Sequence, residues 1–246
     1  MGAETGIPVG IRPPRGLVPL LIPYERRAEA GRAGAEWNAA HRCWTIDARL
    51  CGTVPRWMLP TRNRPDLRPP YLVIALVPQT SWGRNLRSMM GQEAWREFAR
   101  SRIYASTGSL CRICGGRGDK WPVEADEAWR YDDATGVQTL HAVVPLCPAC
   151  HEVRSAGLAM ANGRGRAIVA HLSMIERITT READARIDEA LAVWKRRSQR
   201  RWTIDMSMMS TRYGITVEHD ADVTQDAHAA LVADAIRRRG VDGGRR

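Results

Sequence analysis

The sequence lacks any hydrophobic stretch long enough to cross a lipid bilayer. Its longest apolar runs, residues 17–22 and 72–77, have the length of a β-strand, whereas a membrane-spanning helix needs about 20 residues. The N-terminus also lacks the charged and then apolar layout of a secretion signal. Neither an internal repeat nor a long low-complexity tract is present. We therefore expect a cytoplasmic protein with no membrane-spanning segment.

Lysine is nearly absent, although the chain is strongly basic. The 246 residues carry 37 basic and 27 acidic side chains, a net charge of +10, and only Lys120 and Lys195 are lysines. Guanidinium groups bind phosphate oxygens through paired hydrogen bonds, so this balance favours a phosphate-bearing partner, with nucleic acid the first candidate. The length allows one large domain or two to three small ones.

Four of the six cysteines form two C-x-x-C pairs. They are Cys111, Cys114, Cys147 and Cys150. In a chain without a secretion signal, two such pairs predict one structural zinc ion held by four thiolates. The other two, Cys43 and Cys51, fit no metal motif and are expected to behave as small apolar side chains.

The residues between and after the pairs predict a compact unit around the metal. Strands are expected over residues 123–129 and 137–146, joined by a turn at 132–136. A helix is expected over residues 152–161. Hairpin, second cysteine pair and helix would together form a ββα unit pinned by zinc. The predicted fold class is therefore α+β.

The N-terminal quarter predicts a second, smaller α+β domain. Residues 1–16 are rich in glycine and proline and are expected to form a flexible arm. Residues 17–60 predict a strand over 17–22, a helix over 23–33, a turn around Trp37 and a strand over 43–46. Trp37, Trp44 and Trp57 are expected to form its core rather than a base-stacking surface, because so small a domain must bury its few large side chains.

Residues 17–60 also resemble a small domain of unknown function that is found fused to conjugative-transfer primases and related plasmid-borne proteins. The segments that carry the resemblance are Ile22-Pro23-Tyr24, Gly34-Ala35-Glu36-Trp37-Asn38, His41-Arg42-Cys43-Trp44 and Trp57-Met58-Leu59-Pro60. The resemblance implies a mobile element or a DNA-processing context, and it implies no particular chemistry.

Between this domain and the first cysteine pair, three features are expected. Residues 61–70, rich in arginine and proline, predict a linker. Residues 71–77 are continuously apolar and predict a buried strand. A short helical turn over 85–90 is followed by a helix over 93–107, with Gly108 as its C-terminal cap. The zinc module is expected to span residues 71–180.

Residues 181–246 predict a helical C-terminal extension. The sequence Thr179-Thr180-Arg181-Glu182 is a capping box that opens a long helix, which ends in the basic run 195–201. A strand is expected over 202–206 and a last helix over 220–239. Residues 240–246 are expected to be disordered.

The central part of the chain, residues 71–178, resembles an HNH-type (ββα-metal) endonuclease module. The segments that carry the resemblance are Cys111-Arg112-Ile113-Cys114-Gly115-Gly116, Val123-Glu124-Ala125-Asp126-Glu127, Leu146-Cys147-Pro148-Ala149-Cys150-His151, and residues 163–172. The resemblance implies that the zinc is structural. It also implies a second, catalytic divalent metal ion between hairpin and helix. At this ion a phosphodiester bond of DNA would be hydrolysed.

Carried over residue by residue, the resemblance holds at two positions. Asp126 falls on the metal-ligand position of the first strand, and its hard oxygen donors suit Mg²⁺ or Mn²⁺. His151 falls on the first helix ligand. Glu127 stands where the general-base histidine would be, Ala142 where an orienting asparagine would be, and Ser155 where a second helix ligand would be. The resemblance therefore supports the fold more than it supports catalysis.

Two residues are candidates for activating the attacking water. Glu127 could act as a base if burial or Asp126 raises its pKa. A hairpin that closes with Tyr131 opposite Val137 would put His141 across from Glu127. His141 could then act as the base or merely pair with the carboxylate. Another histidine, His171, is expected to be an ordinary packed residue of a helix over 167–178.

Basic side chains flank the cysteine pairs and the helix ends, where they are predicted to contact phosphate. They are Arg112, Arg117, Lys120, Arg130, Arg154, Arg164 and Arg166. Three interpretations stay open: an endonuclease acting on DNA, a degenerate and non-catalytic module that binds duplex DNA, and a zinc-stabilised adaptor with a protein partner.

Overall fold

The computed structural model describes residues 16–217 and residue 234. The expected flexible arm, the last helix over 220–239 and the C-terminal tail lie outside the described residues, apart from Gly16 and Asp234. The fold is mixed α+β, as predicted, with two three-stranded sheets in the orders β1-β3-β2 and β4-β5-β6. No described helix has the length and apolarity needed to span a membrane.

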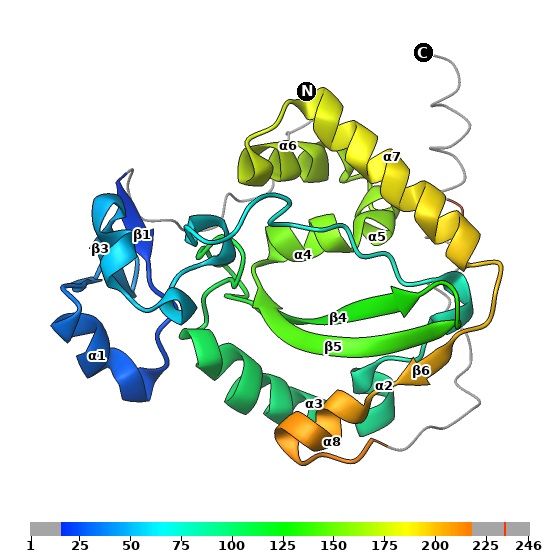
Figure 1. The fold of residues 1–246 in the computed structure, drawn as a ribbon, viewed down its shortest axis with the longest axis horizontal. Coiled ribbons are helices and arrows are strands. Elements are labelled where there is room, and N and C mark those ends of the chain that lie inside the picture. The colour runs from blue at the N-terminus through cyan, green and yellow to red at the C-terminus, as the bar shows by residue number, and fades with distance from the viewer. Residues whose placement is uncertain (1–15, 218–233, 235–246) are drawn as a thin grey trace.

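Residues 17–60, here called the N-terminal unit, form the smaller sheet and one helix (blue in Figure 1). Strand β3 (Cys43–Asp47) pairs antiparallel with β1 (Leu17–Pro19) on one side and with β2 (Glu36–Asn38) on the other. A 3₁₀ turn, Tyr24–Arg26, leads into α1 (Arg27–Arg32). The sequence predicted a turn where β2 lies, because three residues around Trp37 are too few to show strand alternation.

The three tryptophans of this unit do not share one environment. Trp44 and Trp57 pack against the core of the unit, as expected. Trp37, on the edge strand β2, remains 53% exposed and contacts Trp44 edge-on, with 6.0 Å between the ring centroids. The prediction that all three are core residues is therefore wrong for Trp37.

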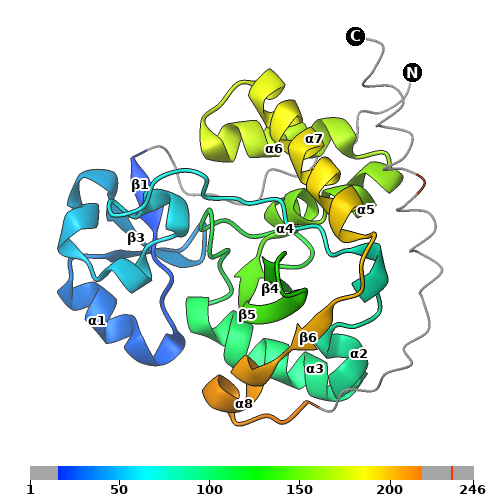
Figure 2. The same ribbon diagram turned by 45° about the vertical axis from the view of Figure 1, so that its right-hand side comes forward.

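A long hairpin lies at the centre of the molecule, with α4 on one side and α2 and α3 on the other (Figures 1 and 2). It consists of β4 (Glu124–Asp132) and β5 (Val137–Leu146), and β6 (Thr203–Asp205) joins β5 in parallel.

The register of the hairpin differs from the predicted one at two points. Asp132, not Tyr131, pairs with Val137, because the Asp132 carboxylate accepts hydrogen bonds from the turn and extends the ladder. A bulge at Ala128/Trp129 then shifts the register again, so that Glu127 pairs with Val143. The predicted pairing of Glu127 with His141 is therefore wrong.

The chain enters the hairpin through helical segments near those predicted. Helix α2 (Leu86–Met90) is followed by α3 (Gln92–Phe98), a π-helical turn over Ala99–Tyr104 and a 3₁₀ turn over Ala105–Thr107. Gly108 ends this run at φ +62°, and a Cβ there would lie 2.6 Å from the carbonyl oxygen of Ile22. Only glycine fits both requirements.

Residues 71–77 are extended but form no strand, contrary to prediction. Their backbone groups bind helices instead of a neighbouring strand: Tyr71 N and Leu72 N donate to Glu176 Oε1 at 2.7 and 2.6 Å, and Ala75 N donates to Arg154 O at 3.1 Å. Glu176 is buried and pairs with Arg186 at 3.1 Å. The apolar run thus marked a segment that enters the core through Leu72, but Val73 stays 52% exposed and the remaining side chains are only partly buried. The hydrogen bonds of the segment could not be read from the sequence.

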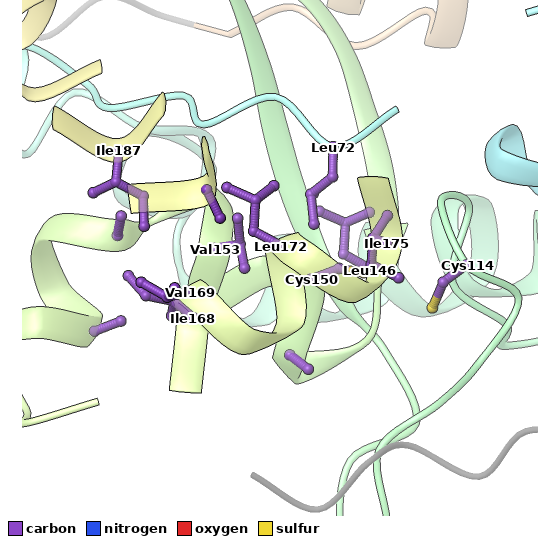
Figure 3. Packing of buried hydrophobic residues seen from close by; sticks show 14 of the residues in the cluster. Leu72, Cys114, Leu146, Cys150, Val153, Ile168, Val169, Leu172, Ile175 and Ile187 are labelled. Carbon is purple, nitrogen blue, oxygen red and sulfur yellow. The ribbon is translucent and has the colours of Figure 1, made fainter. Parts of the chain in front are cut away.

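Helices cover the hairpin end that carries the second cysteine pair. The helix expected over 152–161 begins earlier and is broken at Ser155, giving α4 (Pro148–Arg154) and α5 (Ala156–Ala161). Then follow α6 (Gly165–Glu176) and α7 (Thr180–Arg197), with the predicted capping box at Thr179. Helix α8 (Ser207–Tyr213) packs elsewhere, beside α3 (Figure 1). In the core under α6, Val153 of α4 lies beside Leu172, and Leu146 of β5 lies beside Ile175 (Figure 3).

Candidate metal centre and polar cluster

The four predicted zinc ligands come together. Sulfur atoms of Cys111, Cys114, Cys147 and Cys150 all lie within 4.8 Å of one another, and all four residues are buried. Cys147 is the N-cap of α4 and Cys150 lies in its first turn, while the first pair occupies a tight turn that ends at Gly115, φ +69°. Cys114 Sγ and Cys147 Sγ are 3.7 Å apart. Tetrahedral zinc with bonds of about 2.3 Å separates its sulfurs by about 3.8 Å, so the cluster fits a structural zinc ion.

The environment of these thiols favours a bound cation. Burial raises the pKa of the Cys111 thiol, and contact with the other three sulfurs raises the pKa of Cys150. Four thiolates in a buried cluster would repel one another unless a cation neutralises them. Gly116 N donates to Cys114 Sγ at 3.4 Å, as is common around thiolates bound to metal.

His171 of α6 adds a contact that the sequence analysis did not anticipate. The residue is buried, as expected for a packed histidine, and its Nε2 lies 3.2 Å from Cys150 Sγ. An imidazole in this position can orient a ligand thiolate from outside the coordination sphere. No spacing rule could have found it, since 21 residues and two helix breaks separate it from Cys150.

A second group of polar side chains lies between β4 and α4 and is here called the polar cluster. Glu124 and Asp126, two residues apart, share one face of β4. His151 Nδ1 is hydrogen-bonded to Glu124 Oε2, and His151 Nε2 lies 3.5 Å from Asp126 Oδ1. Arg154 Nε donates to the other Asp126 oxygen, Oδ2, at 2.5 Å. The structure therefore brings the predicted pair Asp126 and His151 together, and their role as metal ligands stays a prediction.

The carboxylates and the imidazole of the polar cluster stabilise each other's charged forms. The hydrogen bond with His151 lowers the pKa of Glu124. Burial lowers the pKa of His151, but Glu124 and Asp126 outweigh burial and raise it overall. Glu124 was not singled out from the sequence, although its two-residue spacing from Asp126 on a strand was the available signal. Arg154 forms an ion pair with Asp126, and its predicted contact with nucleic acid stays a prediction.

Glu127 lies apart from the polar cluster because adjacent strand residues point to opposite faces. Its Oε1 accepts a hydrogen bond from Leu86 N at 2.7 Å, at the start of α2. Burial, assisted by the charge of Asp126, raises the pKa of Glu127 to about 7. The raised pKa that a general base needs is present, but the carboxyl group faces α2 rather than His151.

His141 is likewise separated from the polar cluster. It is the extra residue of the bulge on β5, is exposed, and its Nε2 contacts Arg130 Nη2 at 3.0 Å. Burial and the Arg130 charge lower its pKa. The structure thus divides the four proposed catalytic residues into one pair, Asp126 with His151, and two separate side chains.

The predicted phosphate contacts do not form one basic surface. Arg112 Nη1 donates to Trp57 O at 3.2 Å, and Arg117 Nη2 donates to His41 O, so both fasten the N-terminal unit. Arg164 pairs with Glu152, Nε to Oε1 at 2.9 Å. Lys120 and Arg166 are exposed. Internal contacts therefore occupy most of these side chains, and phosphate binding by the rest stays a prediction.

Comparison with known proteins adds no relative. The chain matches no protein-family model, no curated protein and no solved structure. The two resemblances therefore depend on the residues quoted for them, and of the features they imply the structure shows the four-cysteine cluster.

Proposed function

We propose that the zinc-pinned hairpin and α4 form an HNH-like module, and that the chain is a metal-dependent DNA endonuclease of low activity. The order β4, β5, α4 around four cysteines supports the first part. The observation that carries the second is the orientation of His151: with Nδ1 bound to Glu124, its Nε2 faces Asp126 Oδ1 at 3.5 Å.

This arrangement fits a divalent cation. Donor atoms about 2.1 Å from one ion, at angles between octahedral and tetrahedral, lie about 3.0–3.4 Å apart. Metal-binding histidines usually donate their second ring nitrogen to a carboxylate, the position that Glu124 occupies. Asp126 and His151 would hold the ion, which when bound would supply positive charge to the scissile phosphate and the leaving oxygen.

The surrounding side chains orient this pair. In the neutral ring, Nδ1–H donates to Glu124 and Nε2 is left as the acceptor. Arg154 binds Asp126 Oδ2, which fixes the carboxylate and leaves Oδ1 toward His151. Neither Glu127 nor His141 faces the pair, so neither predicted base is positioned to take a proton from water there. Low activity follows from this separation.

The test is a plasmid-nicking assay in which Mg²⁺, Mn²⁺ or Ni²⁺ is added to zinc-loaded protein. We expect slow nicking that Asp126→Ala abolishes, with zinc content unchanged because the cysteine cluster lies elsewhere. Glu127→Gln is the matched control, since it alters the next carboxylate on the opposite face of β4, and it should retain nicking. Nicking that persists in Asp126→Ala, or that only Glu127→Gln removes, would contradict this assignment.

A second candidate is a non-catalytic module that binds duplex DNA. The ion pair between Arg154 and Asp126 favours it, because the arginine already neutralises the carboxylate. Binding should then show little sequence preference and fall steeply between about 50 and 300 mM salt. Salt-sensitive binding without nicking would support this candidate. No binding at about 50 mM salt would leave the zinc-stabilised adaptor.

A further inference from the structure

A pocket of about 460 Å³ opens between the N-terminal unit and the end of the helical run that precedes the cysteines. Its lining includes the apolar side chains of Leu20, Ile22 and Leu110, together with Gly108 at the end of that run. The volume lies within the range typical of small-ligand sites. We propose that this pocket, here called the aromatic pocket, binds an unstacked base of single-stranded nucleic acid.

Two large aromatic side chains line the aromatic pocket and remain exposed. Tyr24 is 73% and Trp37 is 53% exposed. The edge contact between Trp37 and Trp44, at an interplanar angle of 67°, fixes the exposed indole without burying it. Aromatic surface left in water on a rigid element is a feature of recognition sites, because it becomes stabilising only when a partner covers it.

Two exposed arginines, Arg27 and Arg42, also line the aromatic pocket. The Arg27 guanidinium lies 3.9 Å from the centroid of the Tyr24 ring and donates to Tyr24 O at 2.9 Å, which holds both side chains at this edge. Arg42 adopts φ +48°, a conformation that costs a non-glycine residue energy. Two guanidinium groups beside the rings favour an anionic ligand and disfavour a cationic one.

The rest of the lining offers few groups for reading base edges. The Thr107 hydroxyl already donates to Leu110 O at 2.7 Å, and burial raises the pKa of the Cys43 thiol, which therefore stays neutral. Stacking on aromatic rings with phosphate bound by arginine is the mode by which proteins hold single strands without sequence preference. A paired base in a duplex has both faces covered by its neighbours, so the ligand is a single strand.

This site is separate from the polar cluster, so its test does not require cleavage. Zinc-loaded protein without added Mg²⁺ or Mn²⁺ is titrated into a labelled 12-nucleotide oligo(dT), and into an abasic strand with the same phosphates. We expect tighter binding to oligo(dT). Trp37→Ala should weaken oligo(dT) binding by about 5- to 100-fold and leave abasic binding unchanged, whereas Arg42→Ala should weaken both.

The matched control is Trp121→Ala, which removes a tryptophan of similar exposure, 61%, that does not line this pocket; it should bind oligo(dT) normally. Tyr24→Ala provides a second test should Trp37→Ala disturb β2. Asp126→Ala should bind oligo(dT) as the wild type does, whatever its effect on nicking. Equal affinity for oligo(dT) and the abasic strand, or equal losses in Trp37→Ala and Trp121→Ala, would overturn the proposal.

Discussion

The region around the four cysteines and the N-terminal unit each have a small hydrophobic core, and each is stabilised in a different way. Around the cysteines, the core combines the four sulfurs with residues of α4, α6 and α7. The N-terminal unit has a smaller core, built on strands of three to five residues and on Met58 and Leu59, without a metal cluster among its described residues. A core of that size rarely stabilises a unit by itself. The first region has a four-cysteine cluster that a metal ion can close, and the second has the first region to pack against.

The contacts between the two regions converge on the first cysteine pair. Thr61 N donates to Arg112 O at 2.8 Å, and the Arg112 side chain reaches back to Trp57 O. A Cβ at Gly115 would lie 2.4 Å from Pro19 and 2.7 Å from Pro60. The start of the predicted linker is therefore bound to the turn that the metal shapes, and the N-terminal unit depends on that turn.

Removing the metal should produce the largest effect. Stripping zinc with a chelator, or replacing Cys114 with serine, should unfold α4 and the hairpin end, because structural zinc contributes about 10 kcal/mol or more in comparable sites. The N-terminal unit should also lose its protection against amide hydrogen exchange, because the surface on which it docks is the turn of the first cysteine pair. Metal analysis measures the zinc content, and amide hydrogen exchange measures the protection of each region.

Cys51→Ser is the control for this experiment, because Cys51 is a free cysteine outside the cluster. It should keep one zinc per chain and normal exchange. If the N-terminal unit keeps full protection in the zinc-free protein, the two regions are independent and the comparison fails.

A smaller change can weaken the contact between the regions without replacing a zinc ligand. Gly115→Ala combines a left-handed backbone with contacts to two proline rings and should destabilise the chain by about 2–4 kcal/mol. Gly163→Ala changes a glycine of similar φ, +73°, with no atom within 4 Å, and should cost only about 1 kcal/mol. The difference, measured by urea unfolding and by proteolysis near residues 61–70, isolates the docking contact. Equal losses of stability in Gly115→Ala and Gly163→Ala would mean that the docking contact contributes little to stability.

The sequence predicted the metal centre better than its surroundings. C-x-x-C spacing reports directly on ligand geometry, so all four sulfurs are placed correctly. The pairing of Asp126 and His151 came from the HNH resemblance, and both side chains do meet. The predicted pairing of Glu127 with His141 failed because the turn closes at Asp132 rather than Tyr131 and a bulge at Ala128/Trp129 adds a second shift; no local pattern marks that bulge. Trp37 stays exposed because its strand, β2, lies at the edge of the sheet. Composition does not reveal whether a strand is central or at an edge.

The smallest expected effect concerns the face of the hairpin opposite the metal. Glu127 has a pKa of about 7 in the folded protein against an ordinary value of 4.5, so the folded state retains a proton that the unfolded chain releases between these values. The contribution of Glu127 to the stability of the fold should therefore be greatest below about pH 4.5 and should fall as the pH rises toward 7. Glu127→Gln cannot ionise and should be more stable than wild type at pH 8, by about 3 kcal/mol at most.

Unfolding curves at pH 5 and pH 8 test this, with zinc content measured in parallel. Near pH 5 the two proteins should be almost equally stable. An identical pH profile for both would show that Glu127 is not the titrating group, and a change in zinc content would show that the two faces of the hairpin are coupled.

Strand β6 has a consequence for how the molecule assembles. It pairs in parallel with β5, Val137 opposite Thr203, so this contact joins residues far apart in the chain, whereas β4 and β5 are joined by one tight turn. Local pairing forms early in folding and distant pairing forms late. Until residues 203–205 arrive, the outer edge of β5 presents open hydrogen-bonding groups to any other chain. A ribosome-bound or truncated form ending before Thr203 would therefore be the species most prone to aggregate, although it already contains every zinc ligand.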